Sequence, residues 1–304
     1  MLNEQHPAAS HVKTYTDTLV EHFNWVNELS YLLSIHLNQL IDHENFKSEH
    51  KKLCDRVEEL RSQLTDLISK SNHKNHEDSI NKLDKMSMEI VSLNTKFDCW
   101  SNKSKTLTPF QLRRQKLNPP HNKCKFLVNY RRSQINLNKN EECTVEDNSQ
   151  KIKWKIRKAG SDQSIFVPSV CLAIPPPDEE SLDLIQQLKI RIESLDKQIL
   201  SYRLQFKKDR LFNVMNKIKI CDFDEYEERK KSADANTNFD LILNSVKYEI
   251  EELVNQSTEL NGKNGKNQHF IEFSNSDAKL LIDSYDACSK KLNEFNEKSA
   301  EKNQ

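Results

Sequence analysis

The strongest constraint on the fold of this chain is the position of its helix-breaking residues. Seven of the eight prolines lie between Pro109 and Pro177, and only three glycines occur, Gly160, Gly262 and Gly265. Because proline and glycine interrupt regular structure most strongly, the residues outside this stretch can be helical almost throughout. The sequence therefore predicts long helices on both sides of one structurally different module.

Apolar residues before this module recur at alternating spacings of three and four. The first run contains Val12, Tyr15, Leu19, His22, Val26, Leu29, Leu33, His36 and Leu40. The second run contains Phe46, His50, Leu53, Val57, Leu60, Leu64 and Leu67. This spacing predicts a coiled-coil-like helix that continues through residue 44 with a small change of register.

A second helix is expected after the polar residues 71–76. Its apolar positions are Leu83, Met86, Ile90, Leu93, Phe97 and Trp100. It should end by Pro109, because the residue before a proline is disfavoured in a helix. The first hundred residues are therefore predicted to form an antiparallel helical pair.

Helical spacing returns after Pro177. One run contains Ile185, Leu188, Ile192, Leu195, Ile199, Tyr202 and Phe206. Two later runs, over 239–253 and 278–295, are separated by a polar loop at 255–268. A helix with one narrow apolar stripe cannot bury enough surface alone, so these helices are predicted to pack in three-helix units of the spectrin-repeat type.

The period changes to two between Pro109 and Pro177. Residues 151–157 alternate strictly, which predicts a strand with Ile152, Trp154 and Ile156 on one face and cations on the other. Further short strands are expected at 124–130, 142–146 and 164–167. Several short strands within about 65 residues indicate a small β-barrel.

Particular residues of this module resemble those of SH3 domains. These are Phe126–Tyr130 as the first strand, Leu137–Cys143 as the diverging-turn segment, Trp154, and Val167–Leu172 as the closing strand. The string from Val167 through the triple proline to Asp178 resembles the end of the SH3 domain in plakin cytolinkers, and Leu117–Pro120 resembles the lead-in to that domain. The flanking helices fit the spectrin repeats of the same family.

The resemblance to plakins implies a mainly α fold of spectrin-like repeats with one inserted SH3-like barrel. By analogy, residues 1–44 are the C-terminal helix of a preceding repeat, and 45–108 are the first two helices of the next repeat. The barrel, 109–177, is inserted before the third helix, 178–221, and 222–304 supply the remaining helices of the following repeat. The chain is then expected to be part of a longer protein.

The barrel keeps part of a peptide-binding groove, namely Tyr130, Trp154 and Pro168. Val128 and Cys171 stand where such a groove usually has tyrosines. The short loop that follows Tyr130 has Arg131 and Arg132 but no acidic residue to meet a ligand arginine. We therefore predict that the barrel does not bind proline-rich peptides in the ordinary way.

Charge is distributed unevenly. Residues 105–177 carry 14 Lys/Arg against 5 Asp/Glu, a net charge of +9, whereas residues 1–104 and 178–304 carry −4 and −5. A basic face, Arg131, Arg132, Lys153 and Lys155, is predicted to dock on a neighbouring acidic repeat. The alternative is that this face binds an anionic partner. Nucleic acid is not expected, because no nucleic-acid-binding motif accompanies the charge.

Histidines at positions 22, 36 and 50 fall in the apolar runs, where they are expected either to pack or to loosen the helices on protonation. His73 and His76 alone do not predict a metal site. Seven scattered cysteines without a CxxC pair indicate reduced thiols in the cytosol. No apolar run approaches the length of a membrane span, so no transmembrane segment is predicted.

No catalytic motif or cofactor-binding fingerprint occurs, so we predict a non-enzymatic protein without cofactors. The family resemblance implies a cytoplasmic scaffold segment. Such a segment would connect cytoskeletal filaments to one another or to cell junctions. The alternative is an adaptor whose basic barrel or acidic helix face binds the cytoplasmic tail of a junctional membrane protein.

Overall fold

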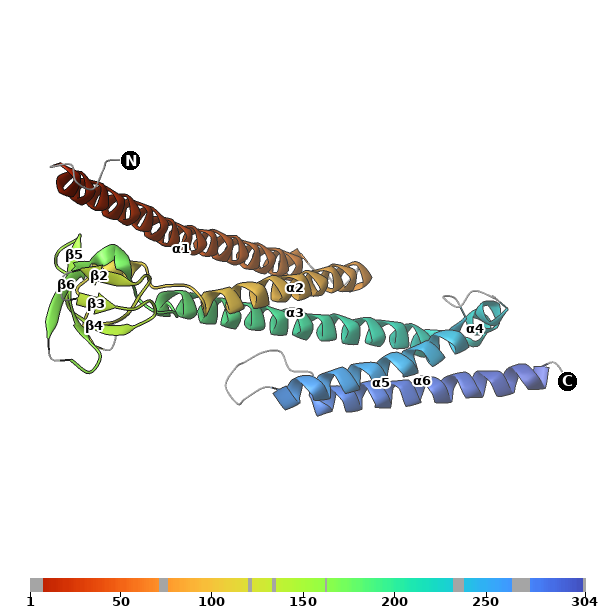
Figure 1. Cartoon of the computed structure of the whole chain (residues 1–304). Helices are drawn as coiled ribbons and strands as arrows, with labels where there is room; N and C mark the ends of the chain where they lie inside the picture. The colour runs from red at the N-terminus through yellow and green to blue at the C-terminus, as the bar shows by residue number, and fades with distance from the viewer. Residues whose placement is uncertain are drawn as a thin grey trace. The chain divides into compact units, whose positions relative to one another are not determined.

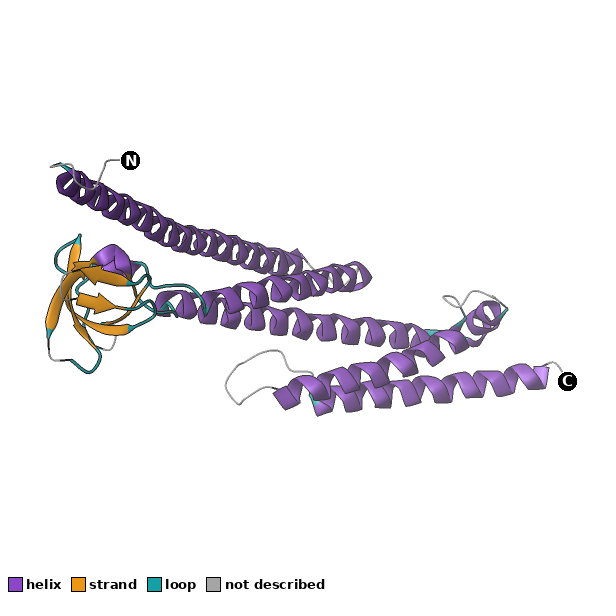
Figure 2. Cartoon of the chain, in the orientation of Figure 1, coloured by secondary structure: helices purple, strands orange, loops and turns teal. Residues whose placement is uncertain are grey.

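The computed structural model describes residues 8–70, 76–119, 122–132, 135–161, 163–231, 238–263 and 274–302. These residues are mainly α-helical, with a small group of strands between residues 123 and 173 (Figure 2). The chain divides into two compact units, residues 1–54 with 95–189, and residues 55–94 with 190–304. Each unit contains parts of the same long helices.

The first helix, α1, runs from Ala9 to Lys70 without a break (Figure 1). It passes through residue 44 as predicted, because no proline or glycine interrupts its backbone hydrogen bonds. The second helix, α2, spans His76–Ser104. Apart from His76, the polar connection expected at 71–76, with His73, lies outside the described residues.

Most of the first predicted seam of α1 is exposed in the described part of the chain. Its members at the surface include Tyr15, which is 78% exposed. The exposed apolar stripe consists of Val12, Tyr15, Leu19, Phe23, Val26, Leu33, Leu37 and Ile41. The buried residues are His36, which belongs to the predicted seam, and Leu32, which does not; consecutive residues such as Leu32 and Leu33 point about 100° apart around a helix. This half of α1 therefore has two apolar faces.

In the second unit, the later part of α1 and the earlier part of α2 pack with the third helix, α3 (Glu179–Ile220). Arg191 of α3 lies 3.9 Å from Glu58 of α1, and Arg203 of α3 lies 2.7 Å from Asp84 of α2. The buried positions between these ion pairs are Val57, Leu60, Leu64, Leu83, Ile90, Ile192, Leu195 and Ile199. The heptad runs thus form the three-helix packing that they predicted.

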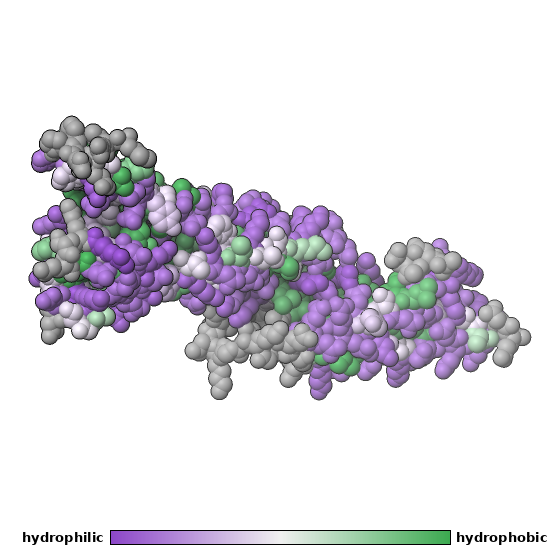
Figure 3. All heavy atoms as spheres, in the orientation of Figure 1, coloured by the Kyte–Doolittle hydropathy of each residue, from purple (hydrophilic) through white to green (hydrophobic). Residues whose placement is uncertain are grey.

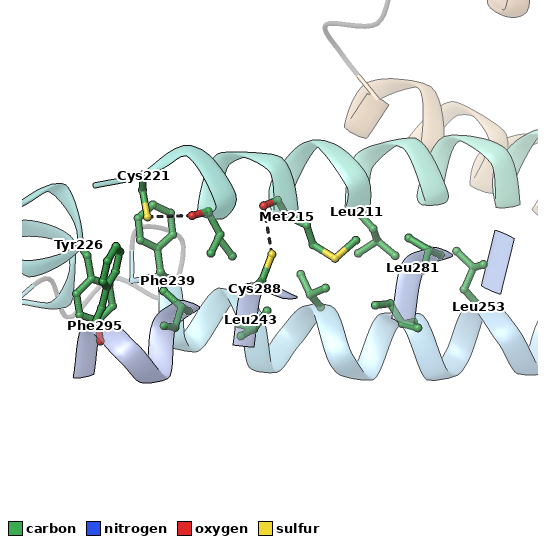
Figure 4. Packing of buried hydrophobic residues seen from close by; sticks show 14 of the residues in the cluster. Leu211, Met215, Cys221, Tyr226, Phe239, Leu243, Leu253, Leu281, Cys288 and Phe295 are labelled. Carbon is green, nitrogen blue, oxygen red and sulfur yellow. Dashed lines mark hydrogen bonds between the residues drawn. The ribbon is translucent and has the colours of Figure 1, made fainter. Parts of the chain in front are cut away.

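The same unit contains α4 (Phe223–Lys230), α5 (Phe239–Lys263) and α6 (Asn275–Lys302). The C-terminal part of α3, α5 and α6 enclose one apolar core, seen from close by in Figure 4. Its fully buried members include Leu211, Met215, Leu281 and Cys288. The Cys288 thiol donates to the Met215 carbonyl oxygen over 3.3 Å, which links α6 to α3.

Sequence analysis did not predict α4. This helix begins because the Asp222 side chain accepts a hydrogen bond from the Glu225 backbone amide, over 2.8 Å. Tyr226 is 1% exposed, and its hydroxyl lies 3.0 Å from Asp240 Oδ2 and 2.7 Å from Asn296 Oδ1. Only Tyr226 and Phe223 of this eight-residue helix pack on the core, and a helix this short shows no heptad signal.

The barrel contains seven short strands in two groups. Five form one antiparallel sheet in the order β6-β5-β4-β1-β7, and two form a separate pair, β2-β3. Their bounds are β1 Lys123–Phe126, β2 Tyr130–Arg132, β3 Ile135–Leu137, β4 Glu142–Asp147, β5 Lys153–Lys158, β6 Ser164–Pro168 and β7 Leu172–Ala173. Gly160, at φ +77°, lies in the turn between β5 and β6, where a side chain would be strained.

Two details of the predicted strands differ in the structure. The strand expected at 124–130 divides into β1 and β2, which belong to different sheets. The strand expected at 151–157 begins only at Lys153, so Ile152 is 77% exposed and does not share the buried face of Trp154. Alternation alone does not reveal where backbone pairing begins, and the pairing of β5 with β6 begins at Lys153 and Pro168.

Candidate interaction site on the barrel

The three groove residues predicted from sequence lie on different strands. Tyr130 opens β2, Trp154 lies in β5 and Pro168 ends β6. Tyr130 is 5% exposed and Trp154 is 2% exposed, and both belong to the apolar core of the barrel. Pro168 is half-buried opposite Lys153. An aromatic ridge that binds a peptide must be open to solvent, and these two rings are covered.

Helix α1 covers the Tyr130 side of the groove. The ring of Trp25 packs edge-to-face against Tyr130, with 6.0 Å between ring centroids and 63° between ring planes. Leu32, two turns further along α1, is fully buried in the barrel core. His36 follows one turn later, and its Nε2 lies 2.8 Å from the carbonyl oxygen of Val170. The groove side of the barrel is therefore an intramolecular contact.

The Trp154 side is covered by Arg113, from the 3₁₀ turn η1 (Gln111–Arg114). Its guanidinium carbon lies 4.7 Å from the centre of the Trp154 ring. The same group donates to the carbonyl oxygens of Ser169, over 2.7 Å, and Leu172, over 2.6 Å. Burial lowers the pKa of Arg113, yet an arginine remains charged in a protein. The Arg113 guanidinium, held by these hydrogen bonds, therefore occupies the position over Trp154 that a bound peptide would take.

Sequence analysis did not assign a site role to Trp25 or Arg113. Trp25 is not one of the residues that form the apolar run between Val12 and Leu40, so heptad spacing does not mark its face. Arg113 precedes the strands and has no periodic pattern. Its position near the start of the barrel was the one available signal, and basic residues are common on surfaces.

The predicted basic face has a different environment. Arg131 and Lys153 are exposed, and the Arg132 side chain lies outside the described residues. Lys155 is 3.3 Å from Glu146, whose other oxygen lies 2.5 Å from Arg157. Hydrogen bonds from Ser164, and then from Arg157, lower the pKa of Glu146 to about 2. Lys155 is therefore paired within the barrel, and the docking role of this face stays a prediction.

The connection from the barrel to α3 also contacts α1. His43 Nε2 lies 3.5 Å from Asp178 Oδ2, with both side chains buried. The same carboxylate oxygen accepts from the Ser181 amide, over 3.1 Å, and from the Ser181 hydroxyl, over 2.5 Å, which caps the start of α3. His50 Nε2 lies 3.2 Å from the Leu184 carbonyl oxygen. Three histidines seven residues apart thus face successive parts of this connection.

These groups do not form a catalytic site. The carboxylate of Asp178 lies between His43 and Ser181, whereas nucleophile activation requires the histidine in the middle. Burial raises the pKa values of Cys124, Cys143 and Cys171 to about 12, so these thiols are unreactive at neutral pH. In the described part of the chain, no group of three or more His, Cys, Asp or Glu side chains is placed to hold a metal ion.

The surface and the helices place two further limits on function. Hydrophilic residues predominate on the face of the molecule drawn in Figure 3, with apolar residues in smaller patches. None of the described helices is both long enough and apolar enough to cross a lipid bilayer. The main structural features of the described residues are thus the packed helices and the barrel groove that Trp25 and Arg113 cover.

Spectrin-type helices with an inserted barrel define a repeat-containing fold, and comparisons with known proteins agree. Residues 109–175 match the model of an SH3 domain family. The solved structure of a rigid four spectrin repeat fragment of the human desmoplakin plakin domain matches 96% of this chain, with a TM-score of 0.71 and 19% identity. The match covers 64% of that chain and confirms the mainly α fold class.

Sequence relatives place the chain in a particular family. It is 29% identical over 196 residues to Microtubule-actin cross-linking factor 1 of Rattus norvegicus, covering 61% of this chain and 4% of that protein. It is 24% identical over 192 residues to Desmoplakin-A of Danio rerio, covering 60% of this chain and 9% of that protein. These matches support a plakin-family segment, and the chain spans less than a tenth of these relatives.

Proposed function

We propose that this chain is a non-enzymatic scaffold segment of a cytolinker, which connects cytoskeletal filaments to one another or to adhesion junctions in the cytoplasm. The names of its relatives include a cross-linker of microtubules and actin. The single observation that carries the proposal is the filled groove: Trp25 covers Tyr130 and Arg113 covers Trp154. A barrel held in this way acts as a brace between helices and not as a reader of peptides.

The domain boundaries from the sequence are proposed with this function. Residues 1–44 would end a preceding repeat, 45–108 and 178–221 would form the interrupted repeat around the barrel 109–177, and 222–304 would belong to the following repeat. The exposed stripe Val12–Ile41 supports the first assignment, because coiled-coil spacing on an exposed face is typical of a helix that packs on further helices.

Removal of Trp25 tests whether the barrel is a brace. In the full chain, Trp25→Ala should lower the stability of the barrel by about 2 kcal/mol, less than the 3–5 kcal/mol for a fully buried aromatic residue. Phe23→Ala is the matched control, because Phe23 is 65% exposed on the same helix. Near-UV circular dichroism during urea unfolding measures both. Equal effects of the two substitutions would remove the support for a brace.

Exposed Arg131 and Lys153 favour a second candidate function, an adaptor that binds an anionic protein tail. A polyglutamate peptide is a suitable probe, since clustered cations attract acidic chains. Under this reading, Arg131→Glu with Lys153→Glu should abolish binding. The control, Lys82→Glu with Lys247→Glu, changes the same total charge at exposed helical positions and should preserve it. Absence of binding by the native chain at low salt would leave the scaffold function alone.

A further inference from the structure

His36 joins α1 to the barrel at the 3₁₀ turn η2 (Ser169–Cys171). The ring is 9% exposed, and its Nε2 lies 2.8 Å from the Val170 carbonyl oxygen. Because a carbonyl oxygen only accepts hydrogen bonds, Nε2 must carry a hydrogen. In the neutral ring, Nδ1 is therefore the bare nitrogen. It is buried and has no hydrogen-bond partner of good geometry among the described residues, although the Gln39 side chain interacts with the ring.

The turn that His36 contacts is held by donors from several elements. Arg113 of η1 donates to the carbonyl oxygens of Ser169 and Leu172, and the Leu127 amide donates to that of Cys171 over 2.9 Å. His36 supplies the donor to the remaining carbonyl, that of Val170. Four successive carbonyls are thus satisfied, and α1 contributes through one titratable side chain.

Protonation of His36 would place a second cation in this buried region. Burial lowers the pKa of His36, and the Arg113 charge lowers it further. The Val170 carbonyl and the Gln39 side chain act in the opposite direction but do not reverse the shift. The neutral ring is therefore the form that the docked structure favours.

We propose that His36 is an acid-sensitive latch, so that protonation of Nδ1 weakens the contact between α1 and η2 and uncovers the Tyr130 side of the groove. The latch rests on the proposed role of the barrel as a docked brace, and it adds a way to release that brace. The species that binds at this switch is a proton, at Nδ1 of His36. The contact would open as the pH falls below neutrality and would close again as the pH rises.

The sign of the effect follows from proton linkage. A histidine whose pKa is lowered by docking contributes stability that is fully present above its ordinary pKa of about 6.5 and is lost as the pH falls through the lowered value. Each unit of separation between the docked and undocked pKa values increases opening by at most about tenfold at low pH. The difference between the docked and undocked pKa values of His36 therefore predicts how much the contact opens at low pH.

The other charged groups around this contact do not reproduce the effect. Cys171 stays protonated, because burial and then the Glu28 charge raise its pKa to about 12. His43 lies against the Asp178 carboxylate at the start of α3. His50 contacts Leu184 beyond that point. A change in pH response on substitution of His36 can therefore be assigned to His36 and not to these neighbouring groups.

The test uses the full chain and two measurements. Nuclear magnetic resonance titration of the histidine ring protons gives the pKa of His36, and hydrogen exchange of peptides covering 165–173 at pH 7.5 and 5.5, corrected for intrinsic rates, gives opening. His36→Gln keeps a side-chain N–H donor but cannot titrate. His22→Gln is the matched control, because His22 is exposed on the same helix.

We expect opening in the native chain and in His22→Gln to increase at pH 5.5 by the factor that the measured pKa predicts, and His36→Gln to show no such increase. An unshifted His36, or an equal pH response in His36→Gln, would overturn the latch. The brace itself is judged separately, because Trp25→Ala must reduce protection of the same peptides at pH 7.5. Protection that is unchanged by Trp25→Ala would count against the proposed function and not against His36.

Discussion

The helical core of α3, α5 and α6 and the contact between α1 and the barrel are both well buried, but they are built differently. The helical core repeats similar apolar contacts along its length, for example Leu211, Leu243 and Leu281. The contact of α1 with the barrel relies on single groups, Trp25 and His36, and η1 adds Arg113 beside them; each has its own partner. A repeated contact can be read from spacing, whereas a single contact depends on two distant segments that meet only after folding.

The largest loss of stability should come from the barrel core. Phe126→Ala removes a fully buried aromatic side chain from β1, and we expect a cost of about 3–5 kcal/mol. Phe166→Ala is the control on the same barrel, because Phe166 is 53% exposed. Urea unfolding followed by near-UV circular dichroism measures both. A similar cost for the two variants would mean that the barrel is not closed around Phe126.

A slightly smaller loss is expected in the helical core. Leu211→Ala should cost about 2–4 kcal/mol, because Leu211 is 1% exposed between α3 and its neighbours. Ile220→Ala, at an 82% exposed position at the end of the same helix, should change stability by less than about 0.5 kcal/mol. Far-UV circular dichroism in urea reports this helical unfolding. If Leu211→Ala behaved like its control, the described core would be wrong.

Arg113 tests the single-group character of the barrel contact. Arg113→Met keeps most of the side-chain volume but leaves the Ser169 and Leu172 carbonyl oxygens without their donors, at a cost of about 1–3 kcal/mol. Arg114→Met is the matched control, since Arg114 is the exposed neighbour. The quenching of Trp154 fluorescence by acrylamide should rise only in the Arg113 variant. An unchanged Trp154 would contradict the role of Arg113 as its cover.

The smallest effect should be the pH dependence that Glu146 contributes. Its pKa is lowered to about 2, so its stabilising contribution is present above the ordinary glutamate range and is lost as the pH falls towards 2. Glu146→Gln should flatten the decline in barrel stability between about pH 4 and pH 2. The control is Glu142→Gln, at an exposed position paired with Lys125. It should leave most of the acid-induced decline in barrel stability in place. Identical acid profiles for both variants would contradict this assignment.

The value of sequence reasoning differed between the two regions. Heptad spacing located α3, α5 and α6, since a buried stripe recurs with every turn of a helix. The same reasoning did not reveal the second apolar face of α1 before residue 42, the face that is buried at Leu32, because spacing marks the more regular face. It also missed α4, which depends on the Asp222 cap and on two aromatic residues, Phe223 and Tyr226.

The candidate site was predicted only in part. Tyr130, Trp154 and Pro168 were found because the SH3 resemblance marks them, and the loss of two groove tyrosines at Val128 and Cys171 already argued against ordinary peptide binding. The residues that cover the groove were not found. Trp25 and Tyr130 are more than a hundred residues apart, and their contact leaves no pattern in either segment.

The sequence by itself determined the helical character of the chain, the position of the barrel and the family resemblance, because proline placement, spacing and short motifs are local properties of the chain. Only the tertiary structure decided which face of α1 is buried, which cation covers Trp154 and which histidine bonds to the barrel. Those outcomes depend on the free energy of packing between segments distant in sequence, and that free energy is set by shape and burial and not by local pattern.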